Sequence, residues 1–228
     1  ADPFPYPTKD FDRGKVLHDA EVEKLQAEGK KFFRYLDSDK DGIPYRTLPG
    51  SQAAGAAYFT RGSGHNEMGQ YTERPAEYQR VMDRLARKYE GARELVPRPI
   101  LSGSPSSEVG LIAFGSTHCA VEEALEMLKR RGVHATYLRL RAFPFHQSVQ
   151  EFVALHSRCY VIEQNRDAQM LKLLKTDLPS EFCTRLRSIL HYDGMPIDAQ
   201  TIVDGVMNTE TPVKPAGREN ALGARGEE

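Results

Sequence analysis

The sequence predicts an α/β protein in which a parallel sheet lies between two layers of helices. Between residues 108 and 207, short apolar runs alternate with amphipathic segments in roughly four β–α units, an order typical of such a sheet. The runs VGLIAF (109–114) and CYVIE (159–163) are almost entirely apolar, as expected of strands that are buried on both faces. We expect an irregular wrapping segment (1–74), the α/β domain (75–207) and a disordered tail (208–228).

The N-terminal segment is rich in Pro, Gly and aromatic residues, and it contains one short helical pattern at residues 19–30. Its aromatic residues are too many for a flexible linker, so we expect them to pack on the following domain or on a partner. They are Phe32, Phe33, Tyr35, Tyr45, Tyr58 and Phe59.

The α/β domain is predicted to open with an amphipathic helix that has Pro75 in its first turn and ends before Gly91. Its apolar stripe has helical spacing and consists of Tyr78, Val81, Met82, Leu85 and Tyr89. A loop (101–108) and the buried strand 109–114 follow. The next helix follows the turn 115–117, carries Val121, Ala124 and Leu128 on one face, and stops at Gly132.

The rest of the domain continues the alternation. Ser148 and Glu151 have the spacing of a capping box, which predicts a helix start at Ser148. Further strands are predicted at 133–140, 159–163 and 186–191, and further helices at 167–174 and 199–207.

Composition excludes several classes of protein. The 228 residues carry 31 Lys and Arg against 32 Asp and Glu, with an isoelectric point near 6.7, which disfavours a dedicated nucleic-acid surface. Apolar runs are far shorter than the ~20 residues of a membrane span, and no signal peptide is evident, so we expect a soluble, cytoplasmic protein. Cys119, Cys159 and Cys183 form no CxxC pair, so no iron–sulfur motif is present. Because the chain begins Ala-Asp-Pro, it could be a fragment or a separate subunit.

Two loops are candidate sites because open parallel sheets bind ligands at the carboxyl ends of their strands. Ser116 and Thr117 place hydroxyl groups at a helix start, where they could cap the helix or bind an anion. In the loop EQNRDAQ, Asn165, Arg166, Asp167 and Gln169 crowd together at another helix start. Asp167 could simply cap that helix, or the loop could form a ligand site or subunit contact.

The segment DSDKDG (37–42) matches the first half of a calcium loop. Asp37, Asp39 and Asp41 could converge on Ca²⁺, and Gly42 permits the sharp turn. Position 12 of the loop is Leu48 rather than a bidentate Glu, so the segment could equally be an Asp-Gly turn.

The loop RGSGHNE combines a cation, a base-capable imidazole, an amide and a carboxylate in Arg61, His65, Asn66 and Glu67. Such a loop could enter an active site, although a catalytic set would need a partner from elsewhere in the protein. Arg61 could bind an oxyanion through its guanidinium group.

Seven separated motifs together resemble one family. FDRGKVL, DSDKDGIPYRTLPG, AAYFTRGSGHNEMGQYTERPAEY, VGLIAFGST, YLRLRAFPF, VIEQNRDAQM and LRSILHYDGMPID occur in the order found in the carboxyl-terminal part of the alpha subunit of bacterial 2-oxoacid:ferredoxin oxidoreductases, especially the 2-oxoglutarate enzymes. The resemblance covers about residues 11–207. It implies a three-layer, transketolase carboxyl-terminal-like fold, in agreement with the periodicity.

The resemblance also implies a reaction and its partners. Family members decarboxylate a 2-oxoacid oxidatively to acyl-coenzyme A, using thiamine diphosphate, and pass electrons through iron–sulfur clusters to ferredoxin. In the family the beta subunit holds the diphosphate, Mg²⁺ and cluster cysteines, and the activating glutamate lies in alpha-subunit domains upstream of this region. By this resemblance the chain carries no catalytic residue and is inactive alone. RGSGHNE and EQNRDAQ are candidate contacts for substrate, coenzyme A or the subunit interface.

Two alternatives remain open. The chain could be a stand-alone interaction module of transketolase-like fold without chemistry of its own, or a scaffold stabilised by a metal at Asp37, Asp39 and Asp41. Fold alone does not separate these from part of an enzyme.

Overall fold

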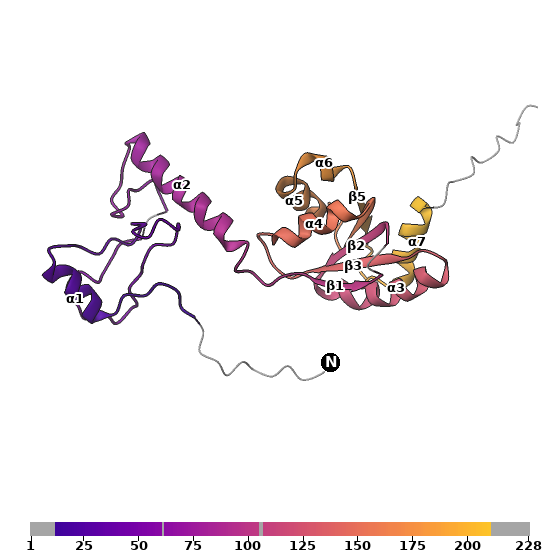
Figure 1. Cartoon of the computed structure of the whole chain (residues 1–228), viewed down its shortest axis with the longest axis horizontal. Coiled ribbons are helices and arrows are strands. Elements are labelled where there is room, and N and C mark those ends of the chain that lie inside the picture. Colours follow the sequence, from indigo (N-terminus) through magenta and orange to yellow (C-terminus); the bar gives the residue numbers. More distant parts are fainter. Residues whose placement is uncertain (1–11, 61, 105–106, 211–228) are drawn as a thin grey trace, which may run out of the picture. The chain divides into compact units, whose positions relative to one another are not determined.

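The computed structural model describes residues 12–60, 62–104 and 107–210, and it divides into two compact units, Ala1–Leu95 and Val96–Glu228 (Figure 1). The first unit includes the helix that we expected to open the α/β domain, so the boundary lies after this helix rather than before Pro75. Most of the expected tail, from residue 211 onward, lies outside the described residues, as do residues 1–11.

The described part of the first unit contains two helices, α1 (Asp19–Ala27) and α2 (Pro75–Ala92), joined by long irregular segments. Its apolar core is small and consists of Val22, Ala53 and Ala56, with Leu17 packed against them. Hydrogen bonds support this core: Thr47 Oγ1 donates to the Ala56 carbonyl at 2.7 Å, and Asp19 accepts from the Gln52 backbone N–H and the Ser51 hydroxyl.

Helix α2 begins at Pro75 as predicted, but it continues through Gly91 to Ala92 and buries a different face. Val81 and Arg84 are its buried residues, whereas the rest of the predicted apolar stripe is 41–47% exposed. The reason is a polar contact with the DSDKDG segment: Arg84 donates to the Gly42 carbonyl at 3.0 Å. A Cβ at Gly42 would lie only 2.6 Å from the backbone nitrogen of Lys88, so only glycine permits this close approach of the segment to α2.

In the residues that the structure describes, the second unit is built on a five-stranded sheet of order β1-β3-β2-β4-β5. The four strands β2 (Val109–Phe114), β3 (Ala135–Leu140), β4 (Arg158–Glu163) and β5 (Leu186–Leu190) are parallel, as predicted. Strand β1 (Ile100–Gly103) lies in the segment expected to be a loop, and it pairs antiparallel with β3. Ile100 and Leu101 are exposed on this edge strand, which therefore lacks the apolar run of a buried strand.

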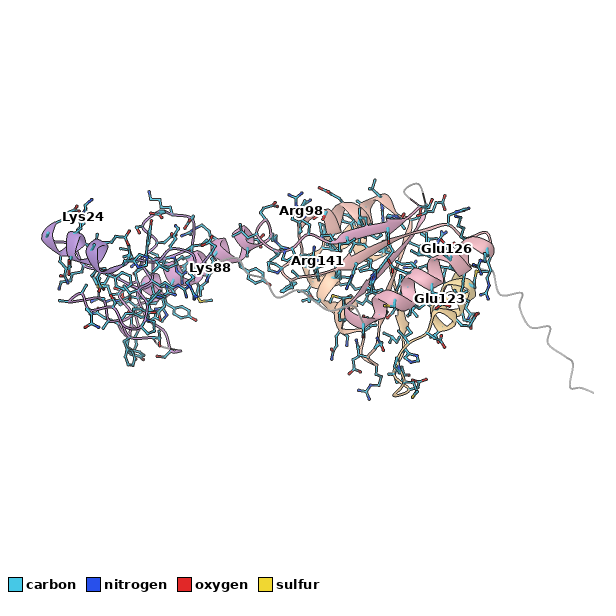
Figure 2. All side chains as sticks on the ribbon, turned by 90° about the horizontal axis from the view of Figure 1, so that it is seen from below. Lys24, Lys88, Arg98, Glu123, Glu126 and Arg141 are labelled. Atoms are coloured by element: carbon cyan, nitrogen blue, oxygen red, sulfur yellow. The ribbon has the colours of Figure 1, made fainter. Side chains whose placement is uncertain are left out.

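Helices cover both faces of the sheet, which confirms the three-layer α/β/α prediction (Figure 1). On one face lie α3 (His118–Arg130) and α7 (Ala199–Glu210). On the other lie α4 (Gln147–Leu155), α5 (Gln169–Asp177) and the short α6 (Ser180–Cys183), which the sequence did not predict. Val121, Ala124 and Leu128 of α3 face the sheet, and Glu123 and Glu126, labelled in Figure 2, are exposed.

The start of α4 differs from the predicted capping box. His146 is the N-cap, and its Nδ1 accepts from the Ser148 backbone N–H at 3.1 Å, so Ser148 lies inside the helix. The histidine ring thus replaces the hydroxyl group that sequence rules favour.

Candidate functional site

The candidate site lies at the carboxyl ends of β2 and β4, where the strand order reverses. These strands are neighbours, yet α3 after β2 and α5 after β4 cover opposite faces of the sheet. Such a switch point opens a crevice between the two loops that leave the sheet, and ligands of open α/β sheets bind there. The loops in question are the 3₁₀ turn η1 (Gly115–Thr117) and the segment 164–168.

Gln164 joins the two loops. Its Nε2 donates to Thr117 Oγ1 at 3.1 Å and to Ser116 Oγ at 3.3 Å, and its Oε1 accepts from the Ile197 backbone N–H at 3.2 Å. Ser116 and Gln164 are exposed, whereas Thr117 is buried. The structure therefore places the predicted residues Ser116, Thr117 and Asn165 at one edge of the sheet. The side chain that links the two loops is Gln164, which was not among the site residues predicted from the sequence.

Glu163, the last residue of β4, is fully buried and was also missed. Its carboxylate accepts from the backbone N–H groups of Met170 at 2.6 Å and Leu171 at 3.0 Å, and from Asn165 Nδ2 at 2.9 Å. The negative charge thus lies at the positive end of α5. A carboxylate that ends the otherwise apolar run CYVIE was the sequence signal for this role.

The cap of α5 is consequently not Asp167. The N-cap position is Ala168, in the left-handed region at φ 51°. Asn165 Oδ1 accepts from the backbone N–H groups of Asp167 at 3.1 Å and Gln169 at 3.3 Å, while Arg166 and Asp167 form an exposed ion pair at 2.8 Å. Glu163 and Asn165 satisfy the first N–H groups of α5, so these groups already have protein acceptors.

His118, the first residue of α3, lies against Tyr137 of β3. The rings of His118 and Tyr137 stack with centroids 5.9 Å apart, and Nε2 of His118 lies 3.5 Å from the Glu122 carboxylate. Among the described residues, neither Nδ1 of His118 nor the Tyr137 hydroxyl has a hydrogen-bond partner. Burial raises the pKa of Tyr137 to about 12, so its hydroxyl stays protonated at neutral pH.

The RGSGHNE loop belongs to the first unit, and Arg61 lies outside the described residues. Asn66 organises the loop: its Oδ1 accepts from the backbone N–H groups of Met68 at 3.0 Å and Gln70 at 3.1 Å. The Glu67 carboxylate accepts from Arg80 Nε of α2 at 2.8 Å, and this hydrogen bond lowers the pKa of Glu67.

His65 makes different contacts from those of its neighbour Glu67. Its Nδ1 lies 2.9 Å from the Asn66 carbonyl oxygen, and its ring packs on Tyr35 with centroids 4.1 Å apart. No hydrogen bond joins the side chains of His65 and Glu67 within the part of the chain that the structure describes. The loop is held by polar contacts of its own, and a catalytic pair is not formed in it.

The carboxylates of DSDKDG bind cations of the protein itself. Lys15 Nζ lies 2.6 Å from both Asp39 Oδ2 and Asp41 Oδ2, and Arg87 donates to Asp37 Oδ2 at 3.0 Å. Asp37 also accepts from the Gly42 backbone N–H. Across residues 12–60, 62–104 and 107–210, no group of three or more His, Cys, Asp or Glu could hold a metal ion. The geometry is that of an Asp-Gly turn rather than of a calcium loop.

The cysteines do not converge either. Cys119 is exposed on α3, Cys159 is buried in the core on the opposite face of the sheet, and Cys183 lies on α6. Burial raises the pKa of Cys159 to about 12. These three thiols do not fit an iron–sulfur cluster, which is typically held by four thiolates.

In the described part of the chain, none of the helices has the length and apolar character of a membrane span.

Comparisons with known proteins show related sequences and a related fold, although no family model matches the chain. The chain is 31% identical over 168 residues to the alpha subunit of 2-oxoacid:ferredoxin oxidoreductase 2 of Aeropyrum pernix, a match that covers 72% of this chain and 24% of the relative. It is 28% identical over 214 residues to the alpha subunit of oxidoreductase 1 of the same organism, covering 90% of the chain and 31% of the relative.

Among solved structures, the 2-oxoglutarate:ferredoxin oxidoreductase of Magnetococcus marinus matches with a TM-score of 0.68 at 21% identity, over 78% of this chain and 30% of that chain. The structure of that enzyme contains 2-oxoglutarate, coenzyme A and succinyl-CoA. The present chain thus spans about a quarter to a third of the length of the relatives it matches, which fits a carboxyl-terminal part. The relatives that the chain matches are alpha subunits of 2-oxoacid:ferredoxin oxidoreductases, the family that the motifs resemble.

Proposed function

We propose that the chain is the carboxyl-terminal part of the alpha subunit of a cytoplasmic 2-oxoacid:ferredoxin oxidoreductase that converts 2-oxoglutarate and coenzyme A to succinyl-CoA. The observation that carries this proposal is the 31% identity to an alpha subunit over 168 residues of the chain. The ligands in the Magnetococcus marinus structure support the choice of substrate. Ferredoxin is the proposed electron acceptor, as the names of the relatives state for those proteins.

The role of this chain in the complex is to form part of a subunit interface rather than to catalyse the reaction. Thiamine diphosphate supplies the chemistry that stabilises the carbanion left by decarboxylation, and iron–sulfur clusters carry electrons. We assign the diphosphate, Mg²⁺ and clusters to the beta subunit and the activating glutamate to upstream alpha-subunit domains. This division follows from the resemblance of the motifs to the family.

The edge of the sheet at which β2 and β4 end is the proposed contact surface of the α/β unit. Ser116 and Gln164 present a hydroxyl and an amide to solvent, and Arg166 and Asp167 add an exposed ion pair beside them. These groups can exchange hydrogen bonds with a partner without disturbing the core, because the buried Glu163 and Thr117 hold the two loops in place. In the first unit, His65, Asn66 and Glu67 are the corresponding candidates.

Reconstitution tests the proposal. The chain alone, the chain with the beta subunit and upstream alpha-subunit domains, and the complex without this chain are compared for reduction of a viologen dye. We expect dye reduction that requires 2-oxoglutarate, coenzyme A and all components, and none from the chain alone. Full activity without the chain would contradict the proposal. Assembly without any gain in activity would favour a stand-alone interaction module.

A matched pair of variants tests the surface. Gln164→Ala removes the amide that joins the two loops, whereas Lys172→Ala changes an exposed residue on α5. We expect Gln164→Ala to weaken assembly of the complex roughly tenfold, as for loss of one well-placed polar contact, and Lys172→Ala to leave it unchanged. Equal affinity for both variants would place the interface elsewhere.

A further inference from the structure

A small cationic cavity lies within the first unit. Its volume is about 320 Å³, and its wall contains six cationic side chains: Arg13, Lys15, Arg34, Arg46, Arg84 and Lys88. The other lining residues are apolar, aromatic or glycine, and none of the described residues that line the cavity is acidic. Six cations around such a small volume repel one another unless anions compensate them.

Only part of this charge is compensated by the protein. Lys15 binds both Asp39 and Asp41 at 2.6 Å, and Arg46 donates to the Arg13 carbonyl at 2.6 Å. Within the described residues, Arg13, Arg34, Arg84 and Lys88 form no ion pair, and Arg34 lies over the rings of Tyr35 and Tyr58 instead. Arg46 donates only to a backbone carbonyl, so five positive side chains line this cavity without a carboxylate partner among the described residues.

Arg84 is the most informative of these side chains because it is only 6% exposed. Its NH1 group donates to the Gly42 carbonyl at 3.0 Å, but its Nε has no hydrogen-bond partner in the described residues. Burial lowers the pKa of Arg84, and the positive charges of Arg34 and Arg87 lower it further, against the opposing effect of Asp37. A buried guanidinium with a free N–H and like charges beside it is a favourable partner for an anion.

We propose that this cavity is a binding site for a small phosphate-bearing anion, with a diphosphate group as the recognised unit. Guanidinium groups bind phosphate oxygens through paired N–H groups, and a diphosphate carries enough charge to compensate several of these cations. The volume is at the lower end of the ~300–1,000 Å³ of ligand pockets, so it suits the phosphate groups rather than a whole nucleotide. This inference does not depend on the proposed oxidoreductase function.

The test is calorimetric titration of the whole 228-residue chain with inorganic phosphate, pyrophosphate and ADP at fixed ionic strength. Lys88→Gln and Arg34→Gln each remove one charge from the cavity, and Arg84→Gln removes the buried guanidinium. Lys24→Gln is the matched control: Lys24 is an exposed lysine on α1, and Figure 2 shows it far from Lys88 within the same unit.

We expect pyrophosphate and ADP to bind with similar affinity and phosphate to bind more weakly. Lys88→Gln and Arg34→Gln should each weaken pyrophosphate binding roughly tenfold, whereas Lys24→Gln should change it less than twofold. The first two variants keep the test valid even if Arg84→Gln does not fold. Absence of pyrophosphate binding, or an equal loss in Lys24→Gln, would overturn the proposal. Binding of ADP without binding of pyrophosphate would overturn the assignment of the diphosphate as the recognised unit.

Discussion

Glu163 accepts a 2.6 Å hydrogen bond from the backbone N–H of Met170, so the last residue of one strand caps the helix that follows it. The same carboxylate binds Leu171 and Asn165, and no part of the side chain is exposed to solvent. The carboxyl end of β4, the first turn of α5 and one wall of the switch-point crevice are therefore held by a single buried group.

Removing this carboxylate should destabilise the second unit strongly. Glu163→Ala leaves two helix N–H groups without an acceptor, and we expect a loss of about 2–4 kcal/mol in the free energy of unfolding. Glu163→Gln keeps one acceptor oxygen and should lose about half as much. Urea denaturation measures both. Asp167→Ala, which removes an exposed carboxylate, is the control and should cost less than ~0.5 kcal/mol.

The neighbouring residues Asn165 and Arg166 should respond differently to truncation. Asn165 Oδ1 accepts two backbone hydrogen bonds, so Asn165→Ala should cost about 1–2 kcal/mol in the free energy of unfolding. Arg166 contributes only an exposed ion pair, and Arg166→Ala should stay within ~0.5 kcal/mol of the original protein. Thermal and urea denaturation measure the loss of stability in both variants. Equal destabilisation would show that Arg166 makes further structural contacts.

The contrast between β2 and β1 shows which parts of the fold the sequence can predict. Every residue of β2 except Phe114 is buried, so the run VGLIAF contains the information that defines the strand. Strand β1 lies at the edge, with Ile100 and Leu101 exposed, and it forms because β3 offers free backbone groups. The sequence of strand β1 alone does not predict this pairing.

The candidate site was predictable in part for the same reason. Parallel strands end at one edge, so Ser116, Thr117 and Asn165 could be placed together from the order of the elements alone. The roles of Gln164 and Glu163 depend on which strands are neighbours and on the backbone after β4, where Ala168 adopts a left-handed conformation. Neither follows from propensity, which favoured Asp167 as the cap.

The Lys15–Asp39–Asp41 cluster should make stability depend on acid pH. Hydrogen bonds from Lys15 lower the pKa values of both carboxyl groups relative to the unfolded chain. The stabilisation is therefore complete above about pH 5 and is lost as the pH falls through the lowered pKa values, below about pH 4. The free energy of unfolding of the original protein and of Lys15→Met is measured from pH 7 to pH 2. The two values should differ at neutral pH and converge in acid. Parallel curves would contradict this expectation.

Calcium should have little effect on the protein. Lys15 and Arg87 already bind the three aspartates, and Leu48 stands where a calcium loop has its bidentate Glu. We expect millimolar Ca²⁺ or Mg²⁺ to shift the melting temperature by less than about 1 °C. Calorimetry that shows micromolar Ca²⁺ affinity, lost in Asp39→Ala, would establish a metal site instead.

Helix α2 offers a test of which face supports the first unit. Amphipathic spacing grouped Val81 and Met82 in one apolar stripe, but Val81 is 4% exposed and Met82 is 45% exposed. Val81→Ala should therefore cost about 2 kcal/mol in the free energy of unfolding, because it leaves a buried cavity. Met82→Ala should cost less than about 1 kcal/mol, because half of its side chain already lies in water. Urea denaturation of the two variants gives the comparison. A larger loss for Met82→Ala would mean that the exposed stripe is covered in solution, by another part of this chain or by a second copy, and sedimentation would separate these two cases.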